Sequence, residues 1–78
     1  MTLERLLKAL YESTDIVFDF NGKTCGIFPL WDGNKTTYHL WYGDEEFILK
    51  NVDHVLSYPA FNGKSMTDIF RDVEIDLQ

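Results

Sequence analysis

The chain has 78 residues, of which 45% are hydrophobic and 15% aromatic, so it can form one packed core and is unlike a disordered chain. Its 13 acidic and 7 basic residues give a net charge of −6, which argues against direct binding to nucleic acid or to an anionic membrane. We therefore expect a single domain over residues 1–78 whose charge fits either a basic protein partner or a well-solvated acidic surface.

Cysteine usage and the first ten residues bear on location. Cys25 is the only cysteine, so no internal disulfide can form. The opening stretch MTLERLLKAL carries Glu4, Arg5 and Lys8 within its apolar run, unlike a signal peptide or a transmembrane span. We expect a cytoplasmic protein.

Residues 2–13 are predicted to form a helix. Thr2 can cap its N-terminus, and Glu4 is favourable in the first turn. The apolar residues recur at helical spacing and form one stripe, made of Leu3, Leu6, Leu7, Leu10 and Tyr11.

Residues 15–50 change to a period of two and contain three turn signals. The segments DIVFDF, KTCGIFPLW, KTTYHLWY and EEFILK are separated by Asn-Gly at 21–22, Asp-Gly at 32–33 and Gly-Asp at 43–44. This pattern predicts a four-stranded antiparallel meander.

Two-residue turns at all three signals would place Phe18 opposite Cys25, Cys25 opposite Leu40, and Leu40 opposite Phe47. One apolar face then results, which the first helix should cover: Ile16, Phe18, Cys25, Ile27, Tyr38, Leu40, Phe47 and Leu49. Pro29 should mark a bulge or the end of a pairing. The opposite face is mixed and contains Val17, Asp19, Thr24, Phe28, Leu30, Thr37, His39, Trp41, Glu46 and Ile48.

The last third of the chain is predicted to hold short elements. Asn51 can begin a helical turn, and Ser65 with Asp68 forms a capping box at the start of a second helix. The apolar stripe of that helix comprises Met66, Ile69, Phe70 and Val73, and Ile75 with Leu77 can add a terminal strand. The fold class is therefore α+β, with an N-terminal helix packed on the meander.

No residue pattern indicates catalysis, a cofactor or a metal. Cys25 and His39 are the one thiol–imidazole pair to test, and the predicted registers place them on opposite faces of the sheet. The cysteine and the two histidines offer no closely spaced ligand pair for a metal. We therefore predict a protein that is not an enzyme, with a small enzyme that uses Cys25 as the remote alternative.

The mixed sheet face is the candidate site for an unidentified protein partner. The contact residues predicted there are Phe28, Trp31, His39 and Trp41, with Asp44, Glu45 and Glu46 for electrostatic steering. The alternative is that the helix begun by Ser65 covers this face. The chain is expected to be a monomer, or a weak dimer if EEFILK is an exposed edge strand.

A second hypothesis is an inhibitor that imitates nucleic acid. Acidic residues cluster at 44–46 and again at Asp68, Asp72, Glu74 and Asp76. If both clusters share one side, they could imitate a run of phosphates. The alternative is a solvated helix and strand edge.

The stretch FNGKSMTDIFRDVEI, residues 61–75, resembles the C-terminal ending of small, uncharacterised acidic accessory proteins of bacteria and mobile elements. In those proteins a DGKSL-type turn leads into a short acidic helix and a closing strand. This chain differs in having Asn62 in place of aspartate and Met66 in place of leucine. The order of elements is also similar to that of some small acidic anti-CRISPR proteins. The resemblance of residues 61–75 implies a small accessory protein without catalytic residues to carry over.

Overall fold

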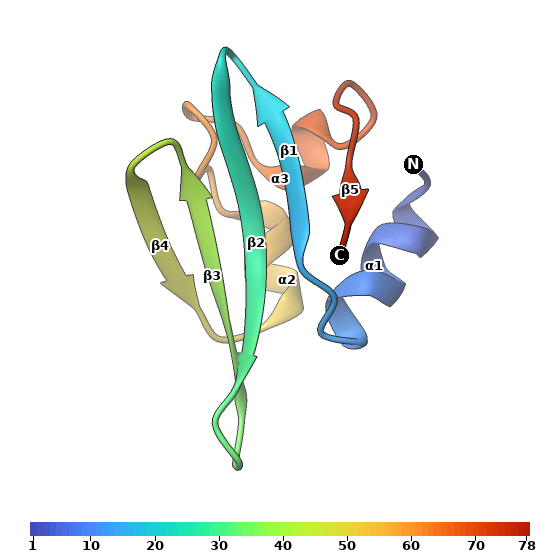
Figure 1. The fold of residues 1–78 in the computed structure, drawn as a ribbon, viewed down its shortest axis with the longest axis vertical. Helices are drawn as coiled ribbons and strands as arrows, with labels where there is room; N and C mark the ends of the chain where they lie inside the picture. The colour runs from blue at the N-terminus through green and yellow to red at the C-terminus, as the bar shows by residue number, and fades with distance from the viewer.

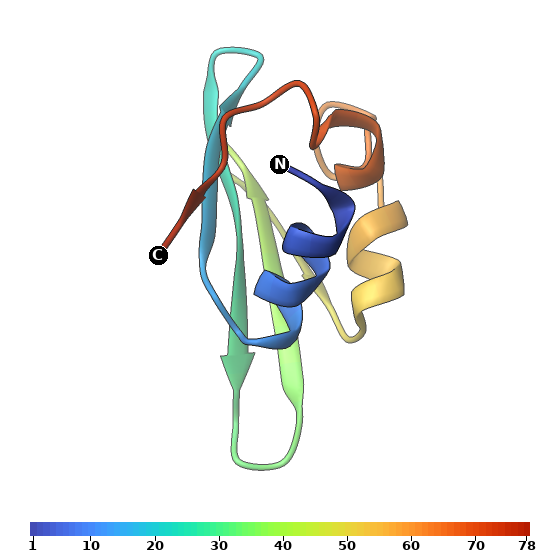
Figure 2. The same ribbon diagram turned by 90° about the vertical axis from the view of Figure 1, so that its right-hand side faces the viewer.

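Five antiparallel strands form one sheet in the order β4-β3-β2-β1-β5, and three helices lie on one of its faces (Figures 1 and 2). This computed structural model describes residues 1–78. The elements are α1 (Leu3–Tyr11), β1 (Ile16–Phe20), β2 (Lys23–Trp31), β3 (Thr36–Tyr42), β4 (Glu45–Leu49), α2 (Val52–Ser57), α3 (Met66–Ile69) and β5 (Asp76–Leu77). The α+β prediction is confirmed, including the terminal strand, which pairs with β1.

Helix α1 forms as its apolar spacing predicts. The Thr2 hydroxyl accepts a hydrogen bond from the Arg5 amide at 3.2 Å and caps the first turn. Leu6 and Leu10 are completely buried against the sheet, with Ala9 beside them. The face of α1 on the sheet is therefore made of Leu6, Ala9 and Leu10. The predicted stripe is wrong at its two ends, because Leu3 and Tyr11 are 40% and 70% exposed.

The predicted pairings of β1 with β2 and of β3 with β4 are confirmed, but the pairing of β2 with β3 is displaced by two residues. Cys25 lies opposite Tyr42, and Leu40 lies opposite Ile27. A shift of two residues leaves every side chain on its predicted face, because alternation in a strand has a period of two.

The displacement has a local cause in the β2–β3 loop. The Asp32 carboxylate accepts hydrogen bonds from the amides of Asn34 and Lys35, both at 2.9 Å, and the Asp32 amide donates to the Lys35 carbonyl at 3.1 Å. These bonds close a four-residue loop, 32–35, in place of the expected two-residue turn.

Pro29 lies inside β2 without a bulge, paired with Tyr38 of β3. The ladder between β1 and β2 ends at Ile27. No strand on that side requires an amide proton from residue 29, which is why proline is tolerated.

The segment from α2 to α3 packs on the same face as α1. Asn51 caps α2, and Ser65 with Asp68 forms the predicted capping box on α3. Helix α3 is shorter than its apolar stripe suggests, because the helix ends at Ile69 and Val73 is only partly buried. Phe61, in the segment between α2 and α3, is the largest completely buried side chain.

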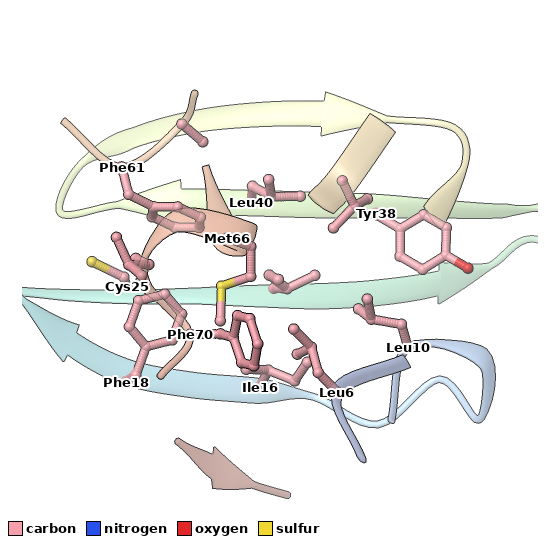
Figure 3. Close-up of a cluster of buried hydrophobic side chains, with 14 of the residues drawn as sticks. Leu6, Leu10, Ile16, Phe18, Cys25, Tyr38, Leu40, Phe61, Met66 and Phe70 are labelled. Carbon is pink, nitrogen blue, oxygen red and sulfur yellow. The ribbon is translucent and has the colours of Figure 1, made fainter. Parts of the chain in front are cut away.

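The core lies between the sheet and the three helices (Figure 3). It joins residues from both ends of the chain, among them Leu6, Ile16, Cys25, Leu40, Phe61 and Met66. Met66, Ile69 and Phe70 are all buried in it, so α3 cannot also cover the opposite sheet face. None of the three helices has the length and apolar character needed to cross a membrane.

Candidate functional site

The sheet face opposite the helices carries no covering element (Figure 2). Its apolar side chains are consequently open to solvent: Phe28 is 37% exposed, Leu30 51% and Ile48 59%. We call this surface the outer face and define it by six residues from β2, β3 and β4: Phe28, Leu30, His39, Trp41, Glu46 and Ile48. Of the two alternatives that the sequence leaves open, the structure has the C-terminal helix on the opposite side of the sheet, so this face is uncovered.

A hollow of about 180 Å³ lies on the outer face. Its lining consists of Phe28, Leu30, His39, Trp41 and Glu46. The rings of Phe28 and Trp41 have centroids 4.3 Å apart and are tilted by 48°, so they form a packed aromatic pair at one side of the hollow.

Pairing between the strands places a carboxylate beside these rings. Glu46 lies directly opposite Trp41, and its Oε1 is 3.0 Å from Nδ1 of His39. This contact is an ion pair when His39 is protonated and a hydrogen bond when Nδ1 carries the proton of the neutral ring. It orients the carboxylate and leaves Oε2 without a partner inside the chain.

Gly26 makes room for the indole of Trp41. It lies opposite Trp41 in the ladder, and a Cβ atom at this position would overlap the far edge of that ring. The edge of the indole therefore lies against the backbone of β2 at Gly26, and Trp41 forms one wall of the hollow.

The structure separates the predicted contact residues into two groups. Phe28, His39, Trp41 and Glu46 come together around the hollow. Trp31 is 64% exposed at the end of β2, where alternation directs it away from the outer face. Asp44 lies in the β3–β4 turn, and Glu45 is directed away from the outer face by the same alternation.

Sequence reasoning placed Leu30 and Ile48 on this face without assigning them as contacts. Alternation with Phe28 and Glu46 was the signal that could have selected them. The role of Gly26 could also have been inferred, because an isolated glycine inside a strand often marks the close approach of another group.

A second hollow, of about 490 Å³, lies between β1 and the segment that leads into β5. Its acidic residues are Asp19, Asp72, Glu74 and Asp76. No group of three histidine, cysteine or carboxylate side chains in the structure is arranged to hold a metal ion.

The two acidic clusters lie in different parts of the molecule: the second has Asp68 in α3, and its Asp72, Glu74 and Asp76 line the hollow beside β1. Residues 44–46 belong to the β4 edge, whereas Asp76 is in β5. Four strand spacings separate these edges, or about 19 Å. The clusters therefore do not form one continuous acidic run.

Cys25 lies on the core face, whereas His39 lies on the outer face. The side chain of Cys25 is completely buried, and its Sγ is 3.4 Å from the Lys23 carbonyl oxygen. Burial raises the pKa of this thiol above its ordinary value, which is the reverse of what a nucleophile requires.

We predict that Cys25 is protected in the native protein. Labelling by a disulfide reagent at pH 8 should be about a hundredfold slower than in urea, because modification requires opening of a domain worth about 3 kcal/mol. A chromogenic thiol assay with and without denaturant measures this ratio. Rapid labelling of the native protein at pH 6 would instead indicate an accessible thiolate.

Comparison of the chain with known protein families, with curated proteins and with solved structures found no match.

Proposed function

We propose that this protein is a non-catalytic accessory protein of the cytoplasm that binds another protein through its outer face. The observation that carries this proposal is the position of all three helices on one side of the sheet, which leaves Phe28, Leu30 and Ile48 exposed on the other. Exposed apolar groups gathered on one face are typical of interaction sites.

The composition of the outer face supports binding to a protein. Trp41 and Phe28 form a rigid aromatic pair, and large aromatic side chains are frequent among the residues that dominate binding energy. Leu30 and Ile48 extend the apolar area, while Glu46 supplies charge at its border. An apolar centre with a polar border is the usual organisation of a protein interface.

The chemistry of the hollow favours a partner that contributes a basic side chain. An arginine or lysine side chain could lie over the Trp41 ring and donate to the free Oε2 of Glu46, which combines a cation–π contact with a charge-assisted hydrogen bond. The net charge of −6 would also attract a basic partner at long range.

The nucleic-acid mimic receives less support from the arrangement of charges. Imitation of a phosphate run needs acidic residues along one continuous surface, whereas residues 44–46 are at the β4 edge of the sheet and Asp76 is at the β5 edge. The resemblance to accessory proteins of bacteria and mobile elements stays a prediction.

Paired variants test the proposal. Tagged wild-type protein, a Phe28→Ser/Leu30→Ser variant and a Tyr11→Ser variant are used to capture proteins from a lysate, and the captured partner is then titrated directly. Tyr11 is the matched control because it is 70% exposed on α1, away from the outer face. We expect the double variant to lose at least about tenfold in affinity and Tyr11→Ser to bind normally.

Equal capture by the two variants would contradict the proposal, as would a partner whose affinity the double variant leaves unchanged. Circular dichroism must show that the double variant is folded, which is expected because substitutions at exposed positions usually have small effects on stability.

A further inference from the structure

Strand β4 is an open edge of the sheet. It pairs with β3 on one side, and no element lies beyond it on the other (Figure 1). The opposite edge differs, because β5 pairs with β1 there. Strand β4 contains no proline or bulge, which are common devices that prevent edge strands from pairing.

The β3–β4 turn determines which backbone groups face this open side. A two-residue turn at Gly43 and Asp44 makes Tyr42 and Glu45 a hydrogen-bonded pair, and bonded pairs then alternate along the strand. The N–H and C=O groups of Glu46 and Ile48 therefore point away from β3. The side chains of these two residues lie on the outer face, and Ile48 is 59% exposed.

We propose that β4 pairs antiparallel with β4 of a second copy of this chain, with Ile48 opposite Ile48 and Glu46 opposite Lys50 in both directions. Lys50 directly follows the strand and is exposed. This register places an apolar pair at the centre and an opposite-charge pair on each side of it, the combinations that stabilise cross-strand contacts. On the core side, Phe47 meets Leu49 of the second copy.

Neighbouring registers are less favourable. Only shifts by two residues keep outward-facing backbone groups opposite each other. A shift in one direction places Glu46 opposite Ile48, and a further shift places Glu46 opposite its own copy, where like charges repel. The charge pattern of the strand therefore favours the register with Ile48 opposite Ile48, and it suits a second copy of the same strand.

The dimer is expected to be weak. Pairing of five-residue strands buries less than the ~800 Å² per partner of a typical stable interface, and each copy carries a charge of −6. A dissociation constant on the order of 0.1 mM is expected for such a contact.

The geometry of the dimer follows from its symmetry. The two-fold axis would place both outer faces on the same side of one extended sheet. The inference does not depend on what the outer face binds.

Charge exchange tests the proposal without knowledge of any partner. Sedimentation equilibrium of the full chain from 10 µM to 1 mM, in 150 mM salt, measures dimerisation of wild type, Glu46→Lys, Lys50→Glu and the double exchange. Each single variant should weaken the dimer at least about tenfold, and the double exchange should restore it to within about threefold.

The same variants distinguish the proposed register from an effect of overall charge repulsion on dimerisation. Glu46→Lys reduces the net charge and would strengthen a dimer limited by overall repulsion, whereas the proposed register requires it to weaken the dimer. The matched controls are Glu12→Lys and Lys35→Glu, which make the same charge changes at exposed sites outside β4. Both should leave strand pairing nearly unchanged.

Ile48→Pro tests strand pairing independently of whether Glu46→Lys folds. Ile48→Pro removes an amide proton that faces the open edge and should give a monomer, while the ladder to β3 stays intact. A wild-type chain that is monomeric at 1 mM would overturn the proposal. A double exchange that does not restore dimerisation would overturn the register.

Discussion

Replacing Phe61 by alanine is expected to abolish cooperative folding of this protein or to leave it barely stable. Phe61 is completely buried, and its ring packs edge to face against Phe18 with centroids 5.3 Å apart (Figure 3). Truncation of a buried phenylalanine to alanine typically costs about 3–5 kcal/mol. A domain of this size is expected to have a net stability of about 3–5 kcal/mol, so the loss is comparable to the whole.

Urea unfolding followed by circular dichroism measures this effect. Tyr11→Ala is the matched control, because Tyr11 is 70% exposed and its removal should change the free energy of unfolding by no more than about 0.5 kcal/mol. Phe61→Leu should lie between the two. A Phe61→Ala variant that keeps a cooperative transition with a loss below about 1 kcal/mol would show that this side chain does not anchor the core.

Gly26→Ala is expected to destabilise the fold by about 2–3 kcal/mol, near the upper end of the usual cost of inserting atoms into a packed region. The new Cβ would overlap the indole of Trp41 and would lie 2.5 Å from the carbonyl oxygen of Ile16. The indole can move away, but the Ile16 carbonyl belongs to the neighbouring strand and has little freedom. The variant should therefore both lose stability and displace the Trp41 ring.

A double-mutant cycle with Trp41→Ala separates these two contributions. If the indole causes part of the cost, Gly26→Ala should be less destabilising by about 1 kcal/mol in the Trp41→Ala background. The destabilisation that persists in the Trp41→Ala background is then the contribution of the backbone contact with Ile16. Tryptophan fluorescence in a Trp31→Phe background observes Trp41 alone, and an unchanged spectrum in Gly26→Ala would contradict the predicted displacement.

The candidate site was only partly predictable. Alternation from Phe28 and Trp41 placed both residues on one face, and it also excluded a Cys25–His39 pair. The same rule could not show that the two rings pack against each other or that His39 reaches Glu46, because these contacts depend on rotamers. Trp31 was grouped with this site because it is close in sequence, whereas strand geometry directs it elsewhere.

The register of β2 with β3 was also not predictable from the turn signal alone. The Asp-Gly at 32–33 is typical of a two-residue turn, but the Asp32 carboxylate instead binds two backbone amides and closes a longer loop. Local side-chain hydrogen bonds of this kind compete with the turn favoured by the dipeptide. The error did not affect the assignment of faces because the displacement was an even number of residues.

Local sequence signals are sufficient to predict several elements of this fold. These are the leucine stripe and cap of α1, the alternation of four strands, and the capping box of Ser65 and Asp68. The packing site of the C-terminal segment has no such local signal. The burial of Phe61, Met66 and Phe70 against the same sheet face as Leu6 depends on contacts between distant parts of the chain. Those contacts leave the outer face open, and no local pattern of residues records them.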